Sequence, residues 1–271
     1  MNTEVSADGV RLAVRVEGAE NAPAIVFVHG WAQSSAAWLP QLTDESLRKY
    51  RLVAVDLRGH GASDVPADGY GDSQVWADEL AAVLDFAAAP AIVVGWSYGG
   101  LVIADYLRAH GTARLSGIVL VGAITEIGRG RPGGSIGPAM AAALPAALSD
   151  DPDIAVPALV EFSRAQATKV VPGALGQAML GASLSTPPFV RKALFKRDVG
   201  SEDVLAAIDV PTLIVHGTDD RVVNFSAAEY AAGKIPGAVT RWLSDVGHLP
   251  FAEVAPEFTG VLRQFADDVT A

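Results

Sequence analysis

Short apolar runs alternate with longer amphipathic stretches through the first 123 residues, and this alternation constrains the fold more than any other feature. Ala24–Val28 and Leu52–Val55 consist of apolar residues, as expected for strands that are buried on both faces. Residues 73–88 instead place their apolar side chains at helical spacing. Leu101–His110 also has helical character and is followed by Gly111, a common helix stop. Strands that alternate with helices predict a mostly parallel central sheet flanked by helices.

The pattern changes between residues 124 and 200, where the strand signal disappears. Alanine, glycine, proline and leucine dominate this segment, and its periodic stretches are helical. Strand patterning resumes at Thr212–Val215 and again at Val239–Leu243. We therefore predict a core domain made of residues 1–123 and 201–271, into which residues 124–200 are inserted as a helical cap.

The composition excludes several classes of protein. There are 20 basic and 31 acidic residues, a formal charge of −11, and no cluster of Lys and Arg that could bind nucleic acid phosphates. The absence of cysteine excludes disulfides, thiolate chemistry and cysteine-based zinc sites. Neither a nucleotide-binding motif nor a metal-ligand cluster is present, so we expect no cofactor and no metal. The polar start at Met1–Gly9 and the lack of a membrane-type stretch predict a cytoplasmic protein that does not act on membranes.

The most specific motif is the Gly-Trp-Ser-Tyr-Gly run at residues 95–99, which joins an apolar strand to a helix. A G-x-S-x-G run in this strand–turn–helix setting is typical of a nucleophile elbow. The sharp turn lifts the serine hydroxyl clear of the sheet. It also brings the residues two before and two after the serine so close together that both must be very small. Ser97 is therefore the predicted nucleophile.

A serine nucleophile needs a base, and the base needs an acid that orients it. His248 lies on a loop between the last strand and the last helix, in the order Ser…Asp…His, and is the predicted base. Two adjacent aspartates, Asp219 and Asp220, follow a strand end, and one of them is expected to be the acid. Their spacing alone does not choose between them. We expect structural roles for the other histidines, which are His29, His60, His110 and His216.

Acyl transfer also requires two hydrogen-bond donors aimed at the developing oxyanion. The backbone N–H of Tyr98, directly after the nucleophile, is the first candidate. The N–H of Trp31, in the His-Gly-Trp loop after the strand at 24–28, is the second. We also expect the side chains of Trp31, Tyr98 and Leu249 to line an apolar substrate pocket, because they flank the catalytic positions.

The chain resembles the α/β-hydrolase superfamily over nearly its whole length. The resemblance rests on His29–Trp31, Asp56–Ser63, the elbow at 95–99, His216–Arg221 and Gly247–His248. It implies the α/β-hydrolase fold, and it favours Asp220 as the acid because that residue precedes an arginine. Within the superfamily the chain looks most like bacterial aryl esterases and cofactor-free haloperoxidases or perhydrolases. It departs from them at Trp96 and Tyr98, where Phe and Met are frequent.

The sequence therefore predicts a serine hydrolase that cleaves small, mostly apolar carboxylic esters or lactones through an acyl-enzyme. Three alternatives use the same scaffold: a carbon–carbon bond hydrolase, a hydroxynitrile lyase and a ligand-binding receptor. The first would need polar groups in the inserted segment to hold an acidic diketone. The basic candidates for that task are Arg129, Arg131, Arg164 and Lys169.

Overall fold

The molecule is built around one sheet, and the computed structural model describes residues 2–88 and 90–271. The strand order is β1-β2-β4-β3-β5-β6-β7-β8. β1 pairs antiparallel with β2, β2 pairs antiparallel with β4, and the remaining pairs are parallel. This arrangement confirms the predicted mostly parallel sheet. The strands are β1 (Asn2–Ala7), β2 (Val10–Gly18), β3 (Ala24–Val28), β4 (Arg51–Val55), β5 (Ala91–Trp96), β6 (Leu115–Val121), β7 (Thr212–Gly217) and β8 (Val239–Leu243).

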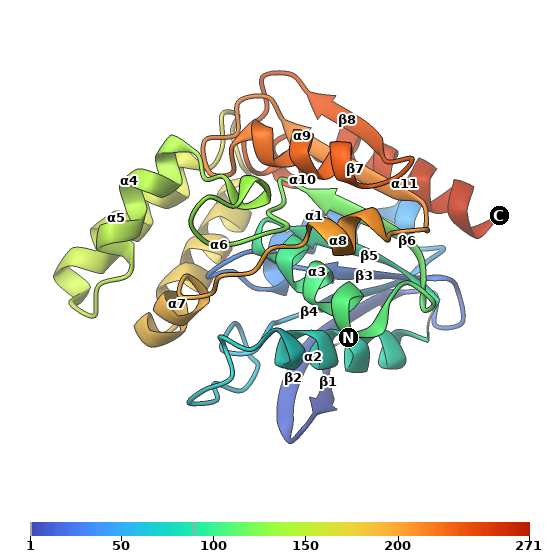
Figure 1. Cartoon of the computed structure of the whole chain (residues 1–271), viewed down its shortest axis with the longest axis horizontal. Helices are drawn as coiled ribbons and strands as arrows, with labels where there is room; N and C mark the ends of the chain where they lie inside the picture. Colours follow the sequence, from blue (N-terminus) through green and yellow to red (C-terminus); the bar gives the residue numbers. More distant parts are fainter. Residues whose placement is uncertain (1, 89) are drawn as a thin grey trace.

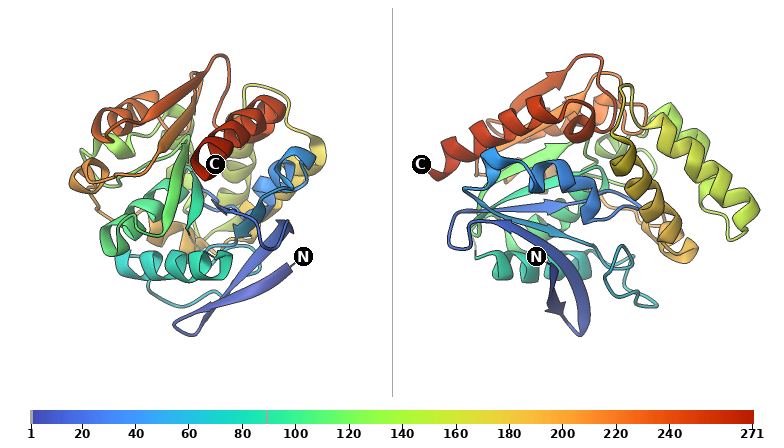
Figure 2. Two further views of the ribbon diagram at one scale, coloured as in Figure 1. Left: turned by 90° about the vertical axis from the view of Figure 1, so that its right-hand side faces the viewer. Right: turned by 180° about the vertical axis from the view of Figure 1, so that it is seen from behind.

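Helices cover both faces of the sheet (Figure 1; Figure 2, left). α2, α3, α8 and α9 pack on one face, whereas α1 and α11 pack on the opposite face. In the part of the chain that the structure describes, every helix is too short or too polar to cross a membrane. The α-helices are α1 (Leu39–Leu42), α2 (Ser73–Ala87), α3 (Tyr98–His110), α4 (Pro138–Ala147), α5 (Pro152–Ala165), α6 (Gly173–Ser185), α7 (Pro188–Leu194), α8 (Glu202–Ala206), α9 (Phe225–Lys234), α10 (Pro250–Glu253) and α11 (Ala255–Thr270). Short 3-10 helices span Ser35–Trp38, Glu45–Leu47 and Pro132–Gly134.

The apolar runs form buried strands because each strand contributes side chains to the hydrophobic cores on both faces of the sheet. In β3, Val26 and Val28 face the cluster under α2 and α3, whereas Ile25 and Phe27 face the cluster that contains Trp38. All four side chains are inaccessible to solvent. Successive residues of a strand point to opposite faces, so a strand covered by helices on both sides must be apolar at every position.

Helices α4–α7 stand beyond the sheet, on the left in Figure 1, between the end of β6 and the start of β7. They occupy much of the segment 124–200, which we call the helical segment. α4 begins at Pro138, where a proline fits the first turn of a helix because that N–H has no helical partner. The N-terminal strand β1 was not predicted, because only Val5 and Ala7 of its six residues are buried.

Three of the four histidines for which we expect structural roles are buried inside this fold. His29, His60 and His216 are 0–2% exposed, and burial lowers the pKa of each below 6.5, that of His60 to about 3. The Nδ1–H of His60 donates to the Arg58 carbonyl, and His29 accepts the Leu57 N–H at Nε2, so both rings have structural partners. These rings stay neutral in the fold at pH values where the unfolded chain protonates them.

We therefore expect the free energy of unfolding to fall as the pH drops below about 6.5, the unfolded value. A depressed histidine pKa in the fold means that acid favours the unfolded chain, by about 1.4 kcal/mol per pH unit for each such histidine. Urea unfolding at pH 7 and pH 5 measures this loss. His60→Asn keeps a donor for the Arg58 carbonyl but cannot titrate. The slope of the unfolding free energy against pH should therefore decrease by the contribution of one histidine, about 1.4 kcal/mol per pH unit. An unchanged slope in this variant would contradict the assignment.

Candidate active site

Ser97 is held in a strained backbone conformation at the tip of β5. Its φ of 54° and ψ of −116° lie outside the regions that residues with a side chain normally adopt. The Ser97 N–H donates to the Val121 carbonyl at 3.0 Å, and the Ser97 carbonyl accepts the N–H of Gly100 and of Ile124. These bonds tie the turn to α3 and to the end of the neighbouring strand β6, so the surrounding backbone maintains the strain.

Glycine is required on both sides of this turn. A Cβ at Gly95 would lie 2.8 Å from the carbonyl carbon of Gly99, and a Cβ at Gly99 would lie 2.5 Å from the Val28 carbonyl oxygen. Real Cβ atoms do not approach backbone atoms so closely. The close approach across the serine, expected from the sequence motif, is therefore present.

Asp220 and His248 are joined by a buried hydrogen bond. The distance from His248 Nδ1 to Asp220 Oδ2 is 2.7 Å, and the two residues are 2% and 9% exposed. An ionised carboxylate can only accept, so the imidazole proton lies on Nδ1 and Nε2 is left as the basic atom. Asp219 is exposed, and its N–H donates to the Val246 carbonyl instead. His248 is thus paired with Asp220 and not with Asp219.

Both oxygens of Asp220 have fixed partners. Oδ1 accepts the N–H groups of Val222 and Val223 at 2.8 and 3.0 Å. Oδ2 is shared between His248 and the buried His216, whose Nε2 lies 3.3 Å away. Burial alone would raise the pKa of Asp220, but its electrostatic interactions with His248 and His216 and its hydrogen bonds together hold that pKa below the ordinary aspartate value. Asp220 is therefore an oriented anion beside the imidazole of His248.

The loop of His248 lies beside the serine turn. The indole N–H of Trp96, the residue before Ser97, donates to the His248 carbonyl at 3.0 Å, and the two rings are 5.3 Å apart. On the other side, a Cβ at Gly122 would lie 3.2 Å from His248 Nδ1. Gly122 follows Val121, the residue that accepts the N–H of Ser97. Ser97 and the loop that carries His248 therefore both lie at the carboxyl ends of β5 and β6.

The loop after β3 reaches the same place. A Cβ at Gly30 would lie 3.0 Å from the Cβ of Ser97, so this loop packs directly on the serine at Gly30. Tyr98 is the first residue of α3, and the N–H of a first helical residue has no partner within its helix. The backbone amides of Trp31 and Tyr98 therefore come from the two segments that flank Ser97. The Trp31 ring packs edge-on against Phe162 and Phe195 of the helical segment.

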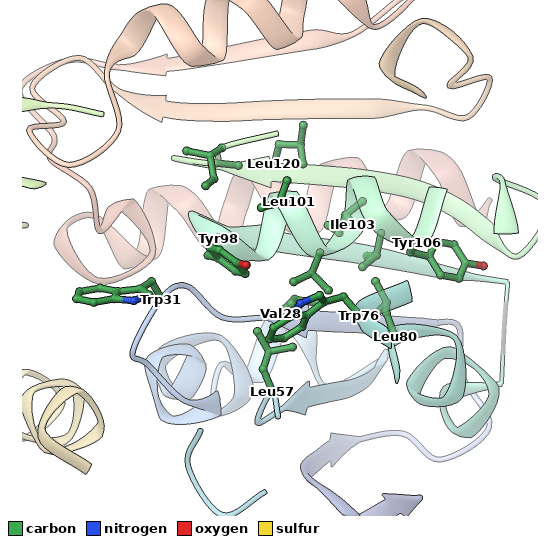
Figure 3. Close-up of a cluster of buried hydrophobic side chains, with 14 of the residues drawn as sticks. Val28, Trp31, Leu57, Trp76, Leu80, Tyr98, Leu101, Ile103, Tyr106 and Leu120 are labelled. Atoms are coloured by element: carbon green, nitrogen blue, oxygen red, sulfur yellow. The ribbon is translucent and has the colours of Figure 1, made fainter. Parts of the chain in front are cut away.

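The side chains of Tyr98 and Leu249 are buried in the two cores. The Tyr98 ring packs against Trp76, and its hydroxyl accepts a hydrogen bond from Arg197. Figure 3 shows Tyr98 within the same cluster as Trp76 and Leu101, with Trp31 at the edge of that cluster. Leu249 is 3% exposed and belongs to the other core. We therefore confine the role proposed for Tyr98 to its backbone N–H.

The known proteins that are similar to this chain point to one family. A model of the alpha/beta hydrolase family matches residues 25–259. The chain belongs to this family. A crystal structure of an esterase from Rhodococcus sp. ECU1013 is similar to this hydrolase, with 46% identity, a TM-score of 0.92 and 99% of each chain covered. A putative aryl esterase from Burkholderia cenocepacia is similar at 28% identity and a TM-score of 0.90, covering 100% of this chain and 99% of the other. A non-heme haloperoxidase from Rhodococcus erythropolis is 32% identical over 83% of this chain and 85% of its own length.

These findings confirm the predicted α/β-hydrolase fold and the resemblance to bacterial esterases and haloperoxidases. Two contacts of the candidate site were not predicted from the sequence. His216 was expected to be structural only, yet it contacts the Asp220 carboxylate. Glu253 was not singled out, yet its carboxylate accepts the N–H groups on both sides of His248. A position five residues after the histidine carries no local signal for such a contact.

Proposed function

We propose that this hydrolase cleaves small, mostly apolar carboxylic esters or lactones, with Ser97 as nucleophile, His248 as base and Asp220 as the acid that orients it. The observation that carries the proposal is the strained serine turn at the end of β5, beside a histidine whose Nδ1 is already held by a buried carboxylate. That arrangement leaves the imidazole only Nε2 with which to accept a proton.

The reaction proposed follows from these positions. Ser97 Oγ attacks the ester carbonyl carbon as its proton passes to His248 Nε2, and Asp220 stabilises the resulting imidazolium. The amides of Trp31 and Tyr98 hold the oxyanion of the tetrahedral intermediate. Collapse breaks the ester C–O bond, and His248 returns the proton to the leaving alkoxide. Water then attacks the acyl-enzyme by the same route and releases the acid and Ser97.

The surroundings of the site favour an uncharged substrate. Trp31, Phe162 and Phe195 form an aromatic cluster beside the loop that packs on Ser97. The basic side chains that a carbon–carbon bond hydrolase would need, Arg129, Arg131, Arg164 and Lys169, are all exposed. Arg131 and Arg164 are paired with Asp198 and Glu161. The similarity to an esterase at 46% identity also supports ester cleavage.

Burst kinetics test the acyl-enzyme. With p-nitrophenyl acetate we expect rapid release of about one equivalent of p-nitrophenol per active site, followed by slower steady turnover, because deacylation needs a second attack. A series of p-nitrophenyl esters of increasing acyl length, together with γ- and δ-lactones, then measures which acyl groups fit. An enzyme that cleaves neither esters nor lactones, or that binds them without turnover, would contradict the proposal and favour a lyase or a receptor.

A further inference from the structure

The carboxylate of Glu253, at the end of α10, holds the loop of His248 from both sides. Glu253 Oε2 accepts the N–H of Gly247 and Oε1 accepts the N–H of Leu249, both at 3.0 Å. These are the residues immediately before and after His248. Hydrogen bonds from backbone amides to an ionised carboxylate are stronger than bonds between neutral groups. Asp220 fixes the histidine ring, and Glu253 fixes the backbone that carries the ring.

The same carboxylate also binds the linker between α5 and α6 of the helical segment. Glu253 Oε2 accepts the N–H groups of Thr168 and Lys169 at 2.8 and 3.0 Å, and the Thr168 hydroxyl lies 2.9 Å from it. Two further contacts join the linker to the base loop directly. The His248 N–H donates to the Gln166 carbonyl at 2.7 Å, and the Thr168 hydroxyl is within 2.9 Å of the Asp245 carbonyl.

We propose that Glu253 is a positioning residue for the base: it locks the His248 loop to the 166–169 linker, so that the helical segment and the imidazole move as one unit. The inference rests on the proposed role of His248. These hydrogen bonds act on His248 through the position of its backbone. An error of about 1 Å in the position of a catalytic group reduces the rate by about 100-fold. Displacement of the helical segment would therefore withdraw the base from Ser97.

A carboxylate is required at this position because its partners are all donors. Four backbone N–H groups point at the two oxygens of Glu253, and these oxygens carry only acceptor lone pairs. Glutamine has nearly the same shape, but its NH2 group would face an N–H on one side. Oε1 accepts one N–H and Oε2 accepts three, so Glu253→Gln removes the charge and breaks at least the bond to the Leu249 N–H without creating a cavity.

We expect Glu253→Gln to lower kcat for p-nitrophenyl acetate by about 10- to 100-fold and to leave KM within about twofold, because base placement enters the chemical step and not substrate binding. The rate of covalent modification of Ser97 by a p-nitrophenyl phosphonate should fall by a similar factor. Glu257→Gln is the matched control. It removes the same charge at an exposed position of α11 and should leave both rates unchanged.

Thr168→Val provides a second measurement that leaves the carboxylate in place. We expect a smaller loss of kcat, and a combined loss with Glu253→Gln that is less than the product of the two separate losses, because both changes weaken the same link. Wild-type kcat and phosphonylation rates in folded Glu253→Gln, or in Thr168→Val if the first variant does not fold, would overturn this inference alone. Turnover that persists in Ser97→Ala would instead overturn the proposed function and this inference with it.

Discussion

Ser97→Ala is expected to lower kcat for p-nitrophenyl acetate by about 10⁶-fold, with KM nearly unchanged. The alanine lacks the oxygen that attacks the ester in the proposed mechanism, so the proposed acyl-enzyme cannot form. Binding contacts and the oxyanion donors would remain, so a small residual rate above the uncatalysed reaction is expected. The measurement is steady-state turnover, together with the burst, which should disappear.

Ser226→Ala is the matched control for this change, because it removes a hydroxyl from an exposed position in the first turn of α9. It should leave kcat unchanged. Thermal unfolding of both variants separates a loss of chemistry from a loss of structure. Near-wild-type turnover in folded Ser97→Ala would refute the serine mechanism.

Asp220→Asn is expected to lower kcat by about 10⁴-fold. The asparagine can keep one oxygen for the N–H groups of Val222 and Val223, so the loop should stay folded. Its NH2 would then face His248 Nδ1, and the imidazole would have to accept there and carry its proton on Nε2. In that tautomer the ring cannot take the proton of Ser97.

Asp219→Asn is the matched control, because it makes the same change of charge one residue away at an exposed side chain. Its kcat should remain within about twofold of the wild-type value. Steady-state kinetics of the two variants compare the aspartates directly. If Asp219→Asn is the damaging change, the pairing of His248 with Asp220 is not the functional one.

Much of the sheet and the serine turn could be predicted from local sequence. β3 begins and ends where its apolar run does, because burial on both faces of the sheet imposes a continuous apolar run. Glycine is needed at positions 95 and 99 because the backbone segments approach each other too closely there to admit a side chain. Asp220 could be preferred over Asp219 only from the family resemblance, since adjacent residues have the same spacing to every other element.

Contacts between distant segments could not be predicted. Tyr98 was expected to line the substrate pocket, but its ring packs on α2 and its hydroxyl meets Arg197, 99 residues further along the chain. Arg197 in turn forms a buried ion pair with Asp105, at 2.6 Å. Glu253 and Thr168 are 85 residues apart. Periodicity reports which face of an element is buried, but it does not report which partner covers that face.

The backbone of Ser97 bears on how such a chain can change over evolutionary time. A glycine would adopt its φ of 54° with little strain, so stability alone favours losing the side chain at this position. Under the proposed mechanism, selection for stability and selection for turnover therefore act in opposite directions on this one residue. A descendant of this protein that had abandoned chemistry for a scaffolding task would be free to accept glycine there, and the turn would relax while the sheet stayed intact.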